Sequence, residues 1–127
     1  MHVLIPILTK LEANEEFLEK ATKGARKATV LIVVDASLQE TFGIAASSLA
    51  QAQEIAEQIK AKLGKKRKSC EVLLEWGSTA ETIDRIARLR AVSKIALIKD
   101  KNAFFRQIVK KLSKSSAYEL EIVTISS

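Results

Sequence analysis

Cysteine, histidine and glycine are scarce in this sequence. The one cysteine, Cys70, excludes an intramolecular disulfide, and the one histidine, His2, leaves too few ligands for a zinc site or a histidine-based catalytic dyad. We therefore expect both residues to be structural. No H-E-x-x-H, CxxC or P-loop motif occurs, so the usual signatures of metalloproteases, thiol redox proteins and P-loop nucleotidases are missing.

Long hydrophobic runs are also missing. No stretch of about 18 apolar residues is available to cross a membrane, and the N-terminus has neither a basic leader nor a small-residue cleavage site. We expect a cytoplasmic protein that does not insert into membranes. The 127 residues, of which 47% are hydrophobic, suffice for a single domain over residues 1–127. The net charge of +6 favours polyanions as neighbours without selecting one.

Five short apolar runs alternate with segments of helical pattern. The runs are 2–9, 28–35, 70–76, 94–100 and 119–126. The second and fourth are almost continuously apolar and rich in Val, Ile and Leu, as in strands that are covered on both faces. Because strands joined through helices run parallel, the pattern predicts a three-layer α/β sandwich around a five-stranded parallel sheet.

The segments between the runs carry helix-terminal signals. The first, 11–25, has acids near its start and ends around Gly24, and the second, 44–64, carries an apolar stripe that stops at Gly64. The third begins with Ser78, followed three residues later by Glu81, which predicts a capping box. The fourth begins at Asn102, a candidate N-cap.

The order and lengths of these elements resemble the universal stress protein family. "HVLIPIL", with Pro6, is similar to the opening strand of that family, "ATVLIVVDAS" to its second strand, and "EVLLEWGSTAETIDRIA" to its third strand, glycine turn and following helix. The resemblance implies an adenine-nucleotide alpha-hydrolase-like fold with strand order 3-2-1-4-5. An alternative takes "VLIVVDAS" as the opening strand, but it leaves the first 27 residues unexplained and supplies only four strands.

ATP-binding members of that family have an aspartate after strand one and a glycine-rich loop beyond strand four. Glycines let backbone N–H groups approach phosphate oxygens closely. Here Leu8 stands at the aspartate position, residues 99–102 read Lys-Asp-Lys-Asn, and no glycine follows Gly77. We therefore expect that the chain does not bind ATP through the usual loop and has no cofactor.

Two groups of residues are candidates for binding an anion at the strand ends. Asp35, Lys99 and Lys101 would form a variant adenine-nucleotide site, with Arg106 and Lys110 adding positive charge. We weigh this against two structural roles. The lysines then belong to a solvated helix face, and the stretch that contains Asp35 and Ser37 serves as a cap or turn, which we prefer.

A dense basic run joins the second helix to the third strand. Lys65, Lys66, Arg67 and Lys68 would contact the phosphates of a polyanion. No aromatic residue interleaves with them to stack on bases, so we favour a solvated turn over nucleic-acid contact. Trp76 closes the third strand, and we expect it at the edge of the core.

The last strand should lie at an edge of the sheet, where its open hydrogen-bonding groups invite pairing. The resemblance implies a homodimer that pairs through this strand, with Ile122, Val123, Thr124 and Ile125 at the interface. A monomer with a solvated edge is the alternative.

A phosphoacceptor receiver domain has the same alternation of strands and helices. It is excluded because "LTK" and "EWGS" supply neither the acidic pair nor the phosphorylated aspartate.

The resulting hypothesis is a non-catalytic protein, not an enzyme, that resembles universal stress proteins. It would act in stress response or regulation by binding a protein partner. The alternatives are adenine-nucleotide binding at the variant site and weak electrostatic binding of nucleic acid by the basic run.

Overall fold

A parallel sheet forms the centre of the protein. The computed structural model describes residues 1–35 and 48–126. All five strands are parallel, in the order β3-β2-β1-β4-β5. They are β1 (His2–Pro6), β2 (Lys27–Val34), β3 (Ser69–Trp76), β4 (Lys94–Ile98) and β5 (Glu119–Val123). The predicted sheet and its strand order are confirmed, and the alternative that makes 28–35 the first strand is wrong because β1 lies at the centre of the sheet.

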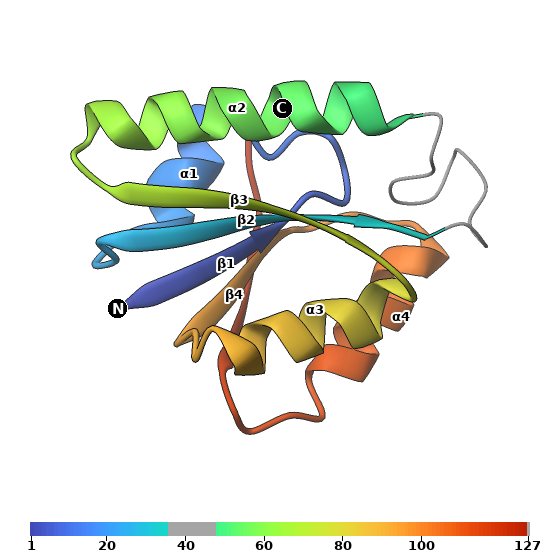
Figure 1. The fold of residues 1–127 in the computed structure, drawn as a ribbon. Coiled ribbons are helices and arrows are strands. Elements are labelled where there is room, and N and C mark those ends of the chain that lie inside the picture. Colours follow the sequence, from blue (N-terminus) through green and yellow to red (C-terminus); the bar gives the residue numbers. More distant parts are fainter. Residues whose placement is uncertain (36–47, 127) are drawn as a thin grey trace.

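Helices cover both faces of this sheet. In the described residues, α1 (Glu15–Ala21) and α2 (Leu49–Lys65) lie on one face, and α3 (Thr79–Leu89) and α4 (Ala103–Leu112) lie on the other (Figure 1). Side chains alternate between the faces along each strand. Val3 and Ile5 therefore join the core under α1 and α2, while Leu4 joins the core above α3 and α4. The predicted three-layer α/β sandwich is confirmed.

The continuous apolar runs mark the strands that are buried on both faces. Seven of the eight residues of β2 are buried, and so are all five residues of β4. The edge strand β3 differs, since none of its residues is fully buried. An edge strand has one neighbour instead of two, which leaves its side chains partly open to water.

Asparagine side chains cap two helices at their N-termini. The Asn14 side chain accepts a hydrogen bond from the N–H of Phe17 (2.9 Å), which starts α1 at Glu15. Asn102 accepts from the N–H of Phe105 (2.7 Å), as predicted. The predicted capping box at Ser78 is wrong, because the Ser78 side chain makes no cap hydrogen bond.

Among the described residues the longest helix is α2, with 17 residues. Its predicted beginning at residue 44 lies outside the described residues, which resume at Ser48. The predicted stripe is confirmed where it is described, since Ala52, Ala56, Ile59 and Leu63 are buried. No helix in the described ranges is both long enough and apolar enough to cross a membrane.

Candidate functional site

The strand tips at the carboxyl end of the sheet come together on one side of the molecule. In open α/β proteins ligands bind at this end, where helix N-termini and turn amides offer N–H groups. The tips of β1, β2 and β4 carry the residues that the sequence singled out. Their hydrogen bonds decide whether those N–H groups are available to a ligand.

A buried glutamate occupies the turn after β1. Glu12 is only 1% exposed, and its Oε2 accepts hydrogen bonds from the N–H of Leu8 (3.2 Å), the N–H of Thr9 (3.0 Å) and the Thr9 hydroxyl (2.9 Å). These bonds end β1 at Pro6, so the predicted strand over 2–9 is too long. Burial raises the pKa of the Glu12 carboxyl, and the hydrogen bonds from Thr9 and Leu8 act in the opposite direction. The turn amides are thereby satisfied from within the protein.

Sequence reasoning missed Glu12, although a signal was present. Thr9 and Glu12 have the spacing of a capping box, in which a hydroxyl residue is followed three positions later by an acid. The glutamate reaches back to the N–H of Thr9, as in that motif.

Asp35 at the tip of β2 caps α3. Its Oδ2 accepts hydrogen bonds from the N–H and from the hydroxyl of Thr79, both at 3.2 Å. A carboxylate at a helix N-terminus also interacts favourably with the helix dipole. Asp35 therefore acts as a cap, which is the role that we preferred for it. It caps α3, the helix that follows the neighbouring strand β3. Ser37 lies outside the described residues.

Gly77 makes the turn from β3 into α3. Its φ is +152°, and a Cβ at this position would come within 2.8 Å of the Thr82 hydroxyl. The glycine is thus needed for a close approach inside the protein. This glycine lies in the stretch that resembles the family, and here it supports packing.

The tip of β4 is built from charged and amide side chains. The Asp100 Oδ1 accepts a hydrogen bond from the N–H of Asn102 (3.1 Å), and Asn102 caps α4. Lys99 and Lys101 are exposed, and the N–H of Lys99 donates to the carbonyl of Val123 (2.9 Å). The amides that a glycine loop would present to phosphate are therefore bonded within the tip at Lys99, Asn102 and Phe105.

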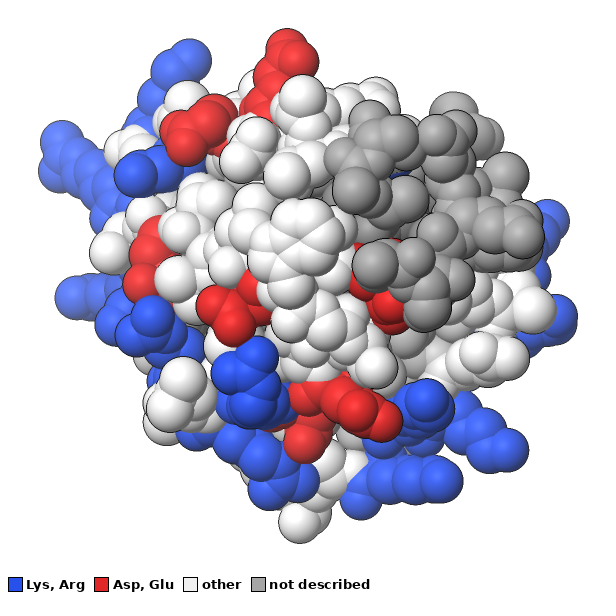
Figure 2. All heavy atoms as spheres, turned by 45° about the vertical axis from the view of Figure 1, so that its right-hand side comes forward, with Lys and Arg blue, Asp and Glu red and all other residues white. Residues whose placement is uncertain are grey.

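The structure separates the members of the predicted variant site. Since β1 lies between β2 and β4, the tips that carry Asp35 and Lys99 are two strand spacings apart, about 10 Å. Asp35 is engaged by Thr79, while Lys99 and Lys101 project into solvent. Figure 2 turns this end of the sheet toward the reader. On the described part of that face, basic side chains project from the rim with acidic ones between them.

The basic run lies at the other end of the sheet, between α2 and β3. Lys65, Lys66 and Arg67 are exposed. Lys68 has an internal role, because its ammonium donates to the carbonyls of Thr22 (3.0 Å) and Ala25 (2.7 Å). These carbonyls follow α1, where a cation is favourable. The predicted polyanion contacts thus include one residue that is already bonded.

The predicted dimer-interface residues have different surroundings. Ile122 is 41% exposed, whereas Val123 is buried. Thr124 and Ile125 follow the end of β5, so the predicted strand over 119–126 is too long. Ile125 packs against the core, and the Thr124 carbonyl accepts from the ammonium of Lys20 (3.3 Å).

Trp76 is not part of the core edge. Its exposed fraction is 59%, so that prediction is wrong. The residue ends the edge strand β3, where the sheet has no further neighbour in the described chain.

His2 and Cys70 lie away from the carboxyl end. The His2 Nε2 and the Thr29 hydroxyl are 2.7 Å apart, and burial is the main cause that lowers the pKa of His2. Burial raises the pKa of the Cys70 thiol to about 11. A neutral thiol is a poor nucleophile.

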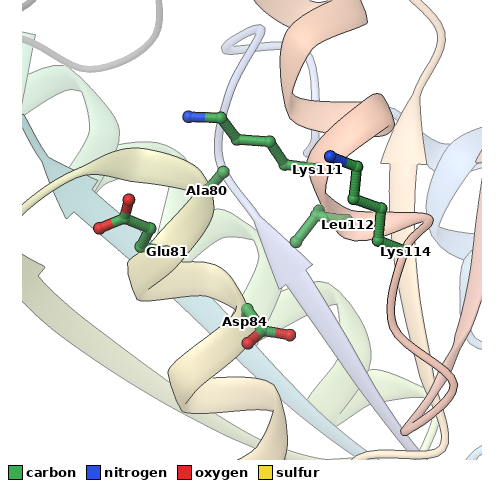
Figure 3. A pocket seen from close by; sticks show the side chains of 6 residues that line it. All are labelled: Ala80, Glu81, Asp84, Lys111, Leu112 and Lys114. Atoms are coloured by element: carbon green, nitrogen blue, oxygen red, sulfur yellow. The ribbon is translucent and has the colours of Figure 1, made fainter.

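A cleft of about 230 Å³ separates α3 from α4 (Figure 3). Ala80, Glu81 and Asp84 line it from α3, and Lys111, Leu112 and Lys114 line it from α4 and the residues that follow. Asp84 is already engaged, because it accepts from the Tyr118 hydroxyl (2.6 Å) and from Arg88 (3.0 Å). Burial and the bond to Asp84 raise the pKa of Tyr118 to about 12.

Comparison with known proteins gives similarity in fold. No family model matches the sequence, and no curated protein matches it at a significant level. A universal stress protein from Archaeoglobus fulgidus has a TM-score of 0.72 at 15% identity, over 99% of this chain and 93% of that one. A universal stress protein in complex with cAMP has a TM-score of 0.66 at 12% identity, over 99% and 98% of the two chains.

A third solved structure is a universal stress protein family member from Burkholderia pseudomallei. It has a TM-score of 0.66 at 17% identity, over 96% of this chain and 94% of that one. At these identities the comparison establishes architecture. The chain has the universal stress protein fold, as the sequence resemblance implied.

Proposed function

We propose that this chain is a non-catalytic regulatory protein of universal stress protein fold. It acts in stress response or regulation by binding proteins and does not bind ATP through a glycine loop. The observation that carries this proposal is that backbone N–H groups at the strand tips are already hydrogen-bonded to side chains of the protein. The carboxylates of Glu12 and Asp35 and the Asn102 side chain accept hydrogen bonds from the turn and helix N–H groups. A nucleotide phosphate would have to displace those side chains before it could use the same donors.

The proposal also describes a homodimer that works in the cytoplasm. Support for the homodimer comes from the two edge strands, β3 and β5, whose outer sides no other strand of the described chain covers. Support for a non-catalytic role comes from Cys70 and His2, the residue types that most often act as nucleophile and base, because neither is poised to react. The Cys70 pKa lies near 11, and the His2 ring is engaged with Thr29.

Adenine-nucleotide binding through a variant site is the second candidate. A neighbour of the same fold is in complex with cAMP, which favours it. In this chain Lys99 and Lys101 would supply the positive charge, since both are exposed near the tip of β4. Point charges without a glycine cradle bind phosphate weakly and lose affinity in salt. The third candidate, a polyanion at Lys65, Lys66 and Arg67, would show the same salt sensitivity.

Thermal unfolding separates the candidates. The purified protein is heated with Mg-ATP, AMP, cAMP or heparin, each at low and at high salt. A ligand of the folded state raises the Tm by mass action. The proposal expects no shift with any nucleotide at high salt. Lys99→Ala/Lys101→Ala and Lys65→Ala/Lys66→Ala are matched variants that remove two positive charges from different ends of the sheet.

Each outcome has a defined meaning. A nucleotide shift that survives high salt and disappears in the Lys99→Ala/Lys101→Ala variant would overturn the proposal in favour of the second candidate. A heparin shift that disappears at high salt and in the Lys65→Ala/Lys66→Ala variant would favour the third. Absence of both shifts supports protein binding, for which the edge strands are the available surface.

A further inference from the structure

The outer edge of β3 offers more unpaired backbone than any other strand edge of the described sheet. Within a strand, the N–H and C=O of one residue point to the same side, and successive residues alternate. The N–H of Ser69 donates to Arg26 (2.9 Å), and the N–H of Gly77 donates to Val34 (3.1 Å). Odd-numbered residues of β3 therefore face β2. The outward residues are Cys70, Val72, Leu74 and Trp76, four of the eight in the strand.

The edge of β5 offers less. The N–H of Glu119 donates to Ser93 (2.9 Å), and the Val123 carbonyl accepts from Lys99, so only Leu120 and Ile122 point outward within this five-residue strand. The carbonyl of the next outward position, Thr124, accepts from Lys20. One register, which joins Leu120 to the partner's Ile122, would place Glu121 opposite the partner's Glu121, each paired with its own Lys94 (2.8 Å). Like charges directly opposite each other destabilise strand pairing.

Most protective features of natural sheet edges are missing from β3, and its two charged residues are engaged within the chain. Edge strands are usually short or carry proline, bulges or lysines. The stretch "SCEVLLEW" contains no proline or lysine, and it pairs with β2 in continuous register. Its two glutamates are paired on their own face of the sheet, Glu71 with Arg90 (3.2 Å) and Glu75 with Arg85 (3.0 Å). The charges that would repel a second strand are thereby partly compensated.

A groove beside this edge supplies apolar surface and both signs of charge. It measures about 420 Å³ and lies between α2 and the sheet. Its lining residues are Ile32, Gln53, Glu57, Lys60, Val72 and Leu74. Figure 1 shows α2 lying along β3 on one face of the sheet. Glu57 and Lys60 are also close enough to Cys70 to influence the pKa of its thiol.

We propose that β3 pairs antiparallel with β3 of a second copy of this chain, about a two-fold axis at Val72. The two five-stranded sheets then join into one sheet of ten strands. This inference rests on the proposed homodimer and names the edge that forms it. A two-fold axis perpendicular to the sheet leaves the α2 faces of both copies on the same side of the joined sheet. Opposing residues must therefore both have even numbers or both have odd numbers. Val72 then faces the partner's Val72, and Cys70 faces the partner's Leu74.

The choice of register follows from overlap and charge, because axes at Val72 or Leu73 pair more of the strand Ser69–Trp76 than axes nearer its ends do. An axis at Leu73 would place Glu71 opposite the partner's Glu75. An axis at Val72 instead places Glu71 opposite the partner's Leu73, and Glu75 opposite the partner's Ser69. This register also reverses the direction of α2 across the axis. Because Glu57 and Lys60 lie within one turn of α2, Glu57 of each copy comes near the partner's Lys60.

Site-specific cross-linking tests the edge. In a Cys70→Ser background, Val72→Cys and the matched Ile122→Cys each place one thiol on one edge strand. Treatment with a short bismaleimide is expected to give a covalent dimer with Val72→Cys and monomer with Ile122→Cys. The opposite result, or equal cross-linking at both positions, would overturn the inference and leave the homodimer standing. A monomer in sedimentation velocity at every protein concentration would overturn both.

Charge exchange tests the register without a new thiol. Glu57→Lys and Lys60→Glu are each expected to raise the dimer Kd about tenfold, because two rim pairs per dimer become repulsive. The double variant Glu57→Lys/Lys60→Glu restores the pairing with the signs exchanged, so its dimer Kd should return to that of the unmodified protein. A purely local role of either residue would give no such rescue. An unchanged Kd in both single variants would overturn the register.

Discussion

The carboxyl end of the sheet and the outer edge of β3 differ in whether their backbone N–H and C=O groups have hydrogen-bond partners. At the carboxyl end, side chains from neighbouring segments take up the amides, as Glu12 does for Leu8 and Thr9 and as Asp35 does for Thr79. Along β3, every second residue leaves its N–H and C=O without a strand partner in the described chain. Within residues 1–35 and 48–126, the turn amides at the carboxyl end are thus closed off by internal acceptors, and the edge of β3 is open to another strand.

This difference has a physical basis in burial. An amide that is withdrawn from water without a partner costs about 1–3 kcal/mol, so the buried turn after β1 needs an internal acceptor. The edge of β3 remains in contact with water, which satisfies its groups until a strand replaces the water. We therefore expect substitutions at the closed end to change the free energy of unfolding. Substitutions at the open edge should mainly change association.

The largest effect is expected at Gly77. Gly77→Ala forces a side chain into a positive-φ conformation and within 2.8 Å of the Thr82 hydroxyl. The expected loss in the free energy of unfolding is about 2–4 kcal/mol, measured as a lower midpoint in urea. The adjacent Trp76→Ala is the control from the open edge. Although it removes a large side chain, the residue is 59% exposed, and the expected change is within about 0.5 kcal/mol.

A second control separates glycine chemistry from position. Gly64 lies in α2, and nothing lies within 4 Å of a Cβ built there. Gly64→Ala should stabilise the protein by about 0.5–1 kcal/mol. If Gly77→Ala and Gly64→Ala behaved alike, the closed end would not have the tight packing described.

A loss of about 1 kcal/mol is expected for Asp35→Ala, because the substitution removes the acceptor at the N-terminus of α3. Urea unfolding measures it. Asp35→Asn keeps an acceptor oxygen and should recover part of the loss, the remainder being the interaction of the charge with the helix dipole. Equal losses in both variants would show that the charge, and not the hydrogen bond, is responsible.

The pH dependence of stability tests Glu12. Burial raises the pKa of this carboxyl in the folded protein above its unfolded value of about 4.3. Below the unfolded value both states hold the proton, and there is no penalty. As the pH rises further, the unfolded state releases the proton first, so stability falls until the folded pKa is passed. Glu12→Gln should therefore match the unmodified protein at pH 4 and gain in Tm relative to it at higher pH.

The titration of His2 has the opposite effect on stability, so it can be told apart from that of Glu12. The pKa of His2 is lowered in the folded protein, so its contribution to stability is lost as the pH falls below about 6.5. His2 is present in both proteins, and the difference between their Tm curves isolates Glu12. A constant difference at all pH values would contradict a titrating buried carboxyl.

The rate of thiol modification probes the open edge itself. With a pKa near 11, Cys70 is almost fully protonated at pH 8, and alkylation should be roughly a hundred-fold slower than in urea. The rate in the folded protein should rise steeply as the pH approaches 11. If β3 pairs with a second copy, the rate at a fixed pH should also fall as protein concentration increases. Iodoacetamide labelling followed by mass spectrometry measures all three trends.

Much of the architecture was predictable because it follows from local pattern. The buried runs of β2 and β4, the stripe of α2 and the cap at Asn102 depend on residues close together in sequence. Two of the predictions that failed concern chain segments that meet only in the fold. Ser78 has the capping-box spacing, yet the carboxylate that accepts from the N–H of Thr79 belongs to Asp35. Trp76 closes the third strand and is expected at the core edge for that reason, but the edge position of this strand leaves it exposed.

The sequence by itself determined the five strands, the parallel connections and the missing glycine loop, because periodicity and composition act over a few residues at a time. Tertiary structure decided how the strand tips are satisfied and which edge is open. Asp35 and Lys68 have partners that depend on how strands and helices align, whereas Glu12 bonds within its own turn and only its burial is set by the fold. Of the two edges, β3 presents the longer row of unpaired groups because it has eight residues and β5 has five. Only the folded sheet shows this contrast, since the unpaired groups are defined by the neighbours that each strand lacks.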